Sequence, residues 1–125
     1  MSDSVTVQME EILNEYNSKV KKVADDVMKD TAKEAAKMLR NTSPVQRGGK
    51  RSGRYARGWR VKEDYGAYIV YNATDWQLTH LLENGHDVVN RYGATGARAG
   101  AIKHIEPVEE WAISEVPVRI SRGLE

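Results

Sequence analysis

A long amphipathic segment at the start of the chain constrains the fold more than any other feature. From Val5 to Arg40, apolar residues recur three or four positions apart with Lys and Glu between them, a period that predicts helix. These positions are Met9, Ile12, Leu13, Tyr16, Val20, Val23, Val27, Ala35 and Met38. Such a helix is about 54 Å long, whereas a compact domain of this chain length is about 35 Å across. Besides an ordinary core helix with a frayed start, the sequence leaves two alternatives: a bend near Asp30 and Thr31, or an N-terminal end that packs on a neighbouring subunit.

A second pattern, with a period of two, follows in the middle of the chain. From Arg57 to Glu63, and again from Ala67 to Asn72, successive residues alternate between two faces. A turn at Asp64 to Gly66 separates the two runs. This predicts an antiparallel β-hairpin. Because two strands alone are marginally stable, we expect a helix on one face and a third strand from residues near Val88 or Ile102.

Two shorter C-terminal helices are predicted from caps and spacing. Thr74 or Asp75 can cap the first helix, Gly85 can close it in a left-handed conformation, and Pro107 fits the first turn of the second. The expected buried face of the first helix is Leu78, Leu81 and Leu82, and that of the second is Val108, Trp111 and Ala112. The order helix, two strands, helix, helix gives an α+β fold.

The composition is that of one globular domain spanning residues 1–125. We expect a helical arm over 1–40, a basic loop over 41–54, and an α+β core over 55–125. A flexible loop is expected over 87–103, where glycine and alanine offer little apolar area to bury. The absence of cysteine excludes disulfides and thiolate metal sites. No signal-peptide pattern or apolar run long enough for a membrane span is present, so we expect assembly in cytosol and no membrane contact.

The net charge of +1 hides a strong division along the chain. Residues 1–40 carry seven Lys or Arg and eight Asp or Glu, residues 41–62 carry seven and none, and residues 63–125 carry five and ten. A basic segment beside an acidic one can dock on an acidic surface, and another copy of the chain offers one. The basic residues predicted to contact a partner or a second subunit are Arg47, Lys50, Arg51, Arg54, Arg57, Arg91, Arg98 and Lys103.

The same basic stretch supports an alternative function, a small nucleic-acid-binding module that uses residues 47–62. Arg and Lys bind phosphates, and Tyr55 and Trp59 lie among the charges where aromatic rings can stack on bases. Trp59, however, falls on one face of a predicted strand, which favours a place in the core.

A metal-dependent hydrolase is the third hypothesis. His80, Glu83 and His86 are three apart, and His104 lies downstream. The spacing differs from that of a zincin helix, whose two histidines are four apart. We therefore expect no metal and no cofactor, with His80 and His86 bonding backbone carbonyls or Glu83, and His104 fixing the turn before Pro107. No nucleophile or carboxylate pair indicates an enzyme.

Three blocks carry a resemblance to a known family. They are LTHLLENGH at Leu78 to His86, HIEPVEEWA at His104 to Ala112, and the weaker SPVQRGGKRSGRYARGWRV at Ser43 to Val61. In this order they resemble the tail-component or tail-completion proteins of long-tailed bacteriophages, the gp-ten-like family. The loop between the two strong blocks departs from the family, which has a shorter glycine-rich stretch. The family-motif residues expected to be structural are Leu81, Leu82, Glu83, Gly85, His86, His104, Pro107 and Trp111.

The resemblance implies a virion structural protein of the head–tail junction or neck, with no enzymatic activity, assembled in the host bacterial cytoplasm. Because a tail is a tube with rotational symmetry, the resemblance also implies a ring of identical subunits, with a hexamer favoured. The implied partners are the tail tube, tail terminator or connector proteins, and contact with DNA in the channel is left open.

Overall fold

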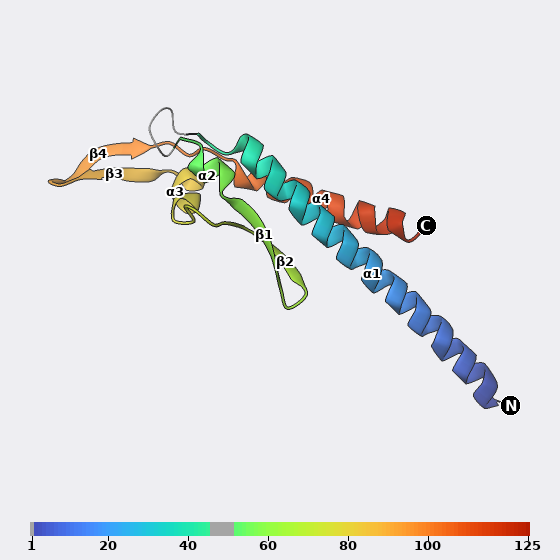
Figure 1. Ribbon diagram of the computed structural model, residues 1–125. Coiled ribbons are helices and arrows are strands. Elements are labelled where there is room, and N and C mark those ends of the chain that lie inside the picture. The colour runs from blue at the N-terminus through green and yellow to red at the C-terminus, as the bar shows by residue number, and fades with distance from the viewer. Residues whose placement is uncertain (1, 46–51) are drawn as a thin grey trace.

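The chain has the predicted α+β class: a long N-terminal helix, antiparallel strand pairs and shorter helices (Figure 1). The computed structural model describes residues 2–45 and 52–125. The helices are α1 (Ser2–Thr42), α2 (Arg54–Arg57), α3 (Leu78–Asn84) and α4 (Ile105–Gly123). The strands are β1 (Trp59–Asp64), β2 (Ala67–Asn72), β3 (His86–Asn90) and β4 (Gly93–Ala99).

Helix α1 is continuous over 41 residues and extends far beyond the rest of the molecule (Figure 1). It passes through Asp30 and Thr31 without a break, so the bend considered from the sequence is not present. The reason is local: no Gly or Pro occurs before Pro44, and a proline disfavours helix at the residue that precedes it. At 1.5 Å per residue α1 is about 62 Å long.

The core lies against the C-terminal third of α1. Ala32, Ala35, Ala36 and Leu39 are buried there, and Ala36 has no exposed surface. Tyr55, Trp59 and Val108 complete the buried cluster from α2, β1 and α4. Small side chains on α1 let these three elements approach its backbone closely, so the core forms where alanine replaces the larger residues of the N-terminal half.

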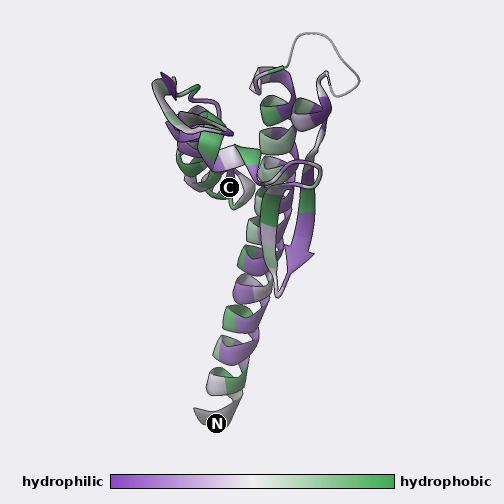
Figure 2. Ribbon diagram, turned by 90° about the vertical axis from the view of Figure 1, so that its left-hand side faces the viewer, coloured by the Kyte–Doolittle hydropathy of each residue, from purple (hydrophilic) through white to green (hydrophobic). Residues whose placement is uncertain are grey.

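Strands β1 and β2 form the predicted hairpin along α1 (Figure 2). The register runs from Trp59 opposite Asn72 to Asp64 opposite Ala67. Tyr65 and Gly66 both have positive φ, at 48° and 79°, as a two-residue type I′ turn requires. The expected third strand was wrong, because in the described part of the chain this sheet has two strands and Val88 lies in β3 of a separate pair. The hairpin is stabilised by packing on α1 instead of by a third strand.

The segment expected as a flexible loop over 87–103 is mostly a second antiparallel ribbon. Strand β3 pairs with β4 from His86 opposite Ala99 to Asn90 opposite Gly93, with a bulge between Asp87 and Val89. Strand pairing uses backbone groups and does not depend on large side chains, so an alanine- and glycine-rich sequence can form it. Gly93 and Gly96 adopt positive φ within β4, a conformation that glycine allows without strain. The ribbon projects from the end of the molecule opposite to the N-terminus (Figure 1).

Three further expectations are corrected. The basic segment was expected as a loop over 41–54 that runs into a strand containing Arg57, but α1 extends to Thr42 and residues 54–57 form the helical turn α2. Helix α3 is not capped by Thr74 or Asp75: it begins at Leu78, and Gln77 precedes it without a side-chain cap. Its expected apolar face is also wrong, because Leu78 and Leu81 are exposed and Leu82 is half-buried.

Candidate assembly surfaces

The buried residue of α3 is Glu83, and its carboxylate binds backbone N–H groups at the start of α4. Glu83 Oε1 accepts hydrogen bonds from the backbone N–H groups of His104 and Ile105, both at 2.9 Å, and Oε2 accepts one from Glu106 N–H at 3.0 Å. The first N–H groups of a helix have no intrahelical acceptor, and the helix dipole favours negative charge at this end. Glu83 is therefore a cap supplied by one helix to another, and it joins the two strongest sequence blocks.

His104 extends this contact to the third block. Its Nδ1 lies 2.8 Å from the Ile102 carbonyl oxygen and 3.1 Å from Glu83 Oε1, and its Nε2 lies 2.7 Å from the Tyr55 hydroxyl oxygen. With the proton on Nδ1, the ring donates to Ile102 and accepts the Tyr55 O–H. Glu83, His104 and Tyr55 thus connect α3, α4 and α2 through side-chain hydrogen bonds.

The electrostatics of this cluster favour an ionised Glu83 beside a neutral Tyr55. Burial opposes ionisation of Glu83, but hydrogen bonds from the Ile105, His104 and Glu106 N–H groups, with the adjacent His104 ring, lower its pKa below the ordinary 4.5. Burial, and then the charge of Glu83, raises the pKa of Tyr55 to about 12. The Tyr55 hydroxyl consequently remains a donor throughout the neutral range.

Two polar residues missed by sequence reasoning hold the neighbouring elements. Asn72 Nδ2 donates to the Tyr55 carbonyl at 2.8 Å, and its Oδ1 accepts the N–H groups of Thr74 and Asp75. Trp59 Nε1 donates to Ser43 Oγ at 2.8 Å. The sequence NATD at 72–75 has the form of a side-chain-capped turn, a signal that was available, whereas nothing in the sequence points to Ser43.

The other family-motif residues have different surroundings. Leu82 and Trp111 pack against the core, whereas Leu81 is exposed. Gly85 follows α3 with a φ of 77° and a ψ of 171°, so its φ is positive but it does not adopt the left-handed helical conformation expected there. Pro107 lies in the first turn of α4 as expected. His86 begins β3, and its side chain lies outside the described residues.

The basic residues predicted to contact a partner divide between two places, and those that the structure describes have contacts within the chain. Near α2, Arg54 pairs with Asp75 at 3.4 Å, and Arg57 donates to the Ser52 carbonyl. On the second ribbon and just after it lie Arg91, Arg98 and Lys103. Arg91 lies over the Tyr92 ring, Arg98 pairs with Asp87, and Lys103 donates to Asn84 Oδ1. Arg47, Lys50 and Arg51 lie outside the described residues.

The surroundings of these side chains help to choose between docking on a protein partner, nucleic-acid binding and a metal site. Exposed ion pairs such as Arg98 with Asp87 contribute little to stability and can exchange for a partner's charges. Tyr55 and Trp59, in contrast, are both buried, so neither ring can stack on a base as the nucleic-acid alternative requires. Among the described residues, no group of three His, Cys, Asp or Glu side chains could hold a metal ion.

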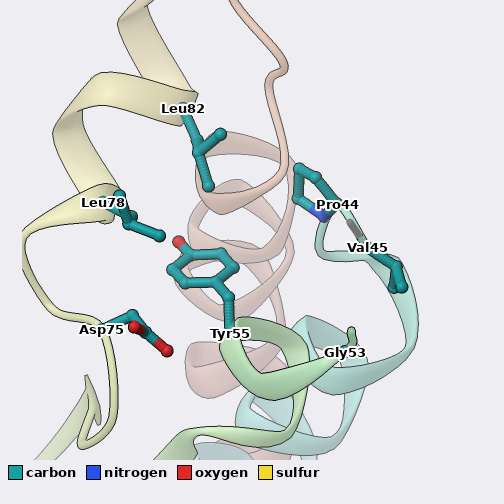
Figure 3. Close-up of a pocket in the computed structure, with 7 residues that line it drawn as sticks. All are labelled: Pro44, Val45, Gly53, Tyr55, Asp75, Leu78 and Leu82. Carbon is teal, nitrogen blue, oxygen red and sulfur yellow. The ribbon is translucent and has the colours of Figure 1, made fainter. Parts of the chain in front are cut away.

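A small pocket lies beside the end of α1. Its volume is about 320 Å³, and it is lined by Pro44, Val45, Gly53, Tyr55, Asp75, Leu78 and Leu82. Figure 3 shows the Tyr55 ring between the leucines of α3 and the segment that follows α1. The exposed edge of Leu78 is therefore part of this pocket rather than of a core.

A long exposed apolar surface lies on the N-terminal half of α1. We call residues 5–20 the arm. Its large apolar residues Val5, Met9, Ile12, Leu13 and Tyr16 are all more than half exposed, and Ile12 reaches 65%. Figure 2 shows hydrophobic and hydrophilic residues alternating in bands along α1 toward the N-terminus. No other element of the described chain covers this part of the helix (Figure 1).

The accessible surface of the chain is large for its mass. It amounts to 9408 Å². A compact monomer of 14.1 kDa is expected to expose only about 6,700 Å². Isolated two-stranded ribbons and single protruding helices are marginally stable in water, so both ends of the molecule are suited to contact with other proteins.

The fold defines a small α+β protein with a small core, a protruding helix and a projecting ribbon. A family model described as "Bacteriophage HK97-gp10, putative tail-component" matches residues 7–85, which include most of α1 and the chain through α3. The chain belongs to this family of bacteriophage tail components. No curated protein and no solved structure matches it. In the described residues, none of the helices is both long and apolar enough to cross a membrane.

Proposed function

We propose that the protein is a structural component of the virion at the head–tail junction, where copies of it form a ring that completes or joins the tail. Membership of the tail-component family carries the proposal. The surplus of exposed surface supports it, because a subunit completed by its neighbours is expected to look unfinished alone. The protein has no catalytic role in this proposal and needs no cofactor.

The charge division supports subunit contacts of the heterologous kind. In a ring each subunit presents two different surfaces to its two neighbours. The basic segment over residues 41–62 is a candidate for one surface, and the acidic segment over residues 63–125, with five Lys or Arg against ten Asp or Glu, is a candidate for the other. A hexamer is favoured for such a ring because it must match the symmetry of a tail tube. Tail tube, terminator or connector proteins are the remaining partners.

The test of function is a phage from which this gene is deleted. Filled heads and separate tails should accumulate, and electron microscopy of the lysate distinguishes them from joined virions. A plasmid copy of the wild-type gene should restore joining. Normal yields of complete, infectious virions without the protein would refute a role at the junction.

The basic surface is tested by a variant with Arg47, Lys50, Arg51 and Arg54 replaced by serine. We expect the variant to fold normally, because the pair that it breaks between Arg54 and Asp75 is partly exposed and such pairs contribute about 1 kcal/mol or less. We expect it to fail to restore joining. DNA binding is measured for both proteins at several salt concentrations. Normal joining together with the loss of tight, salt-sensitive DNA binding would favour the nucleic-acid alternative.

A further inference from the structure

A groove lies between the hairpin β1–β2 and helix α4, with α1 as its floor. Both neighbours pack on α1, whereas the hairpin and α4 make few contacts with each other. Two adjoining cavities of about 220 and 150 Å³ occupy this space, and both are lined by Ala35, Val70 and Ala112. Strand β2 forms one wall and α4 the other. Apolar surface of three elements is therefore left uncovered by the described chain.

The wall formed by β2 is the free edge of a sheet. The Ala73 N–H donates to the Gly58 carbonyl at 2.8 Å, so these two residues form a hydrogen-bonded pair of the hairpin. Bonded and non-bonded pairs alternate along an antiparallel ladder, so Tyr68 and Val70 direct their backbone N–H and C=O groups away from β1. Within the described residues these groups have no hydrogen-bond partner. Such an edge is a template for a further strand.

The floor of the groove holds a second polar group without a partner. Thr31 lines the smaller cavity and is only 3% exposed. Its hydroxyl oxygen makes no hydrogen bond within the described part of the chain, although buried hydroxyls are nearly always paired. A helix uses its backbone groups internally, so only an extended segment can pair with β2. The groove therefore has the form of a site for a strand.

The charge at the groove favours a basic strand. Glu109 is exposed, and among the described residues that line the two cavities it is the one with a formal charge. Ile113 follows one turn later on the same side of α4 and is 67% exposed. A strand seated here would meet apolar surface bordered by a carboxylate. It therefore needs small or apolar side chains together with a basic one.

The second ribbon of another copy has this composition. Residues 91–99 contain two arginines and no acidic residue, and apart from Arg98 strand β4 consists of Gly, Ala and Thr. At the tip, Arg91 lies over the ring of Tyr92, which is 82% exposed. Tyr and Arg are among the residues that most often anchor protein interfaces. The ribbon points away from the hairpin of its own chain, so the groove that it can enter belongs to a neighbour (Figure 1).

We propose that the ribbon of one copy enters the groove of the next and pairs β4 with the free edge of β2. The two-stranded sheet of each subunit is thereby extended by the two strands of its neighbour's ribbon. The open part of β2 runs only from Tyr68 to Val70, so a short stretch of β4 is enough, and the positive φ of Gly96 does not prevent pairing. The contact is heterologous, and its closure into a ring rests on the proposed function.

Amide exchange tests the strand pairing. Wild-type protein is exchanged in dilute solution and again at a concentration where it self-associates, then quenched and analysed by NMR as the dissociated chain. The Tyr68 and Val70 amides should exchange at least about tenfold more slowly after association, because they gain acceptors on β4. Ile69 and Tyr71 already bond β1 and serve as internal controls that should change little.

Complementary variants test whether the occupant is a second copy. Ala112→Phe fills the groove from α4, and the double variant Arg91→Glu, Tyr92→Ser alters the tip of the ribbon. Each alone should raise the dissociation constant for self-association at least about tenfold. An equimolar mixture should form a dimer that does not grow, because it combines one intact groove with one intact ribbon. Sedimentation velocity measures both, circular dichroism checks folding, and Ser114→Phe, at an exposed position of α4, is the control.

The charge of the groove is tested separately on α4. Glu109→Arg should weaken self-association, because it places a basic residue beside a basic strand. Glu110→Arg makes the same change at an exposed neighbouring position that lines neither cavity, and it should have little effect. Equal effects of the two variants would contradict the contact between the ribbon and Glu109.

Four outcomes would overturn the proposal. They are a wild-type protein that does not self-associate, association without protection of the Tyr68 and Val70 amides, association that the ribbon variant leaves unchanged, and a mixture of variants that stays monomeric. Association lost only when residues 2–18 are removed would place a neighbour's arm in the contact instead. Normal tail joining by Ala112→Phe in a phage that requires the gene would refute the ribbon contact and leave the proposed function standing.

Discussion

The two ends of α1 obey one periodicity and have opposite surroundings. At the C-terminal end, Ala32, Ala35 and Leu39 are buried beneath α2, β1 and α4. At the N-terminal end, larger residues such as Ile12 and Tyr16 recur at the same spacing of three or four residues and are exposed. Helical spacing therefore indicates that a face will be covered, but it does not indicate whether the cover comes from the same chain or from another molecule.

The strongest test of this comparison is the loss of a large core side chain. Trp59→Ala should lower the free energy of unfolding by about 3 to 5 kcal/mol, because a buried indole is removed and Ser43 loses its donor. Tyr16→Ala in the arm should change it by about 0.5 kcal/mol or less in dilute protein. Chemical denaturation at a concentration below self-association measures both. Similar losses for the two variants would mean that the arm is part of the intrachain core.

A somewhat smaller loss is expected when the cap between α3 and α4 is removed. Glu83→Ala leaves three backbone N–H groups at the start of α4 without their acceptor. We expect a loss of roughly 2 to 3 kcal/mol, in line with the removal of a helix cap and unpaired buried donors. Glu110→Ala, at an exposed position of the same helix, serves as the control. Thermal unfolding curves that show equal effects would contradict the capping role.

The next largest loss of stability is expected at Gly58, whose backbone lies close to the Thr74 and Asn72 side chains. A β-carbon at Gly58 would lie 2.1 Å from Thr74 Oγ1 and 2.8 Å from Asn72 Oδ1. Gly58→Ala should therefore cost about 1 to 2 kcal/mol of stability through overpacking. Gly100→Ala, where a β-carbon meets no atom within 4 Å, should be close to neutral. If Gly58→Ala proved as harmless as Gly100→Ala, the packing around Asn72 would be looser than the structure indicates.

The smallest expected effect is the contribution of Glu83 to the pH dependence of folding stability. Because the pKa of Glu83 is lower in the folded protein than its ordinary 4.5, the carboxylate stabilises the fold above that value. This contribution is lost as the pH falls below 4.5 through the folded-state pKa. Stability measured from pH 6 to pH 3 should decline less steeply for Glu83→Gln than for wild type. Parallel declines would show that other carboxylates dominate the acid response.

Much of the fold followed from local patterns. The period of α1, the alternation of β1 and β2 and the positions of Gly85 and Pro107 are properties of neighbouring residues, so sequence reasoning located them. It failed for the second ribbon, whose small residues give no alternating apolar signal although their backbone groups pair. It also assigned an apolar face to α3, because three leucines at helical spacing outweighed one glutamate.

The residues of the candidate surfaces were likewise predictable only in part from the sequence. The sequence singled out Glu83 and His104 and predicted that the basic positions contact a partner. It left Tyr55 open to the nucleic-acid alternative, although it favoured the core for Trp59. Their burial depends on Ser43, Asn72 and His104, which lie 16, 17 and 49 positions away from the residues they bond. Spacing along the chain does not specify such contacts.

By itself, the sequence determined the long amphipathic helix, the first hairpin, the division of charge and the resemblance to a phage tail family, because each depends on residue types at short range. Only the tertiary structure decided that Glu83 caps α4, that the aromatic residues of the basic segment are buried, and that the arm has no cover within the described chain. These depend on which elements meet in space. That outcome follows from the packing of the whole chain, in which alanines on one half of α1 admit neighbours and α4 ends beside Val23 of α1.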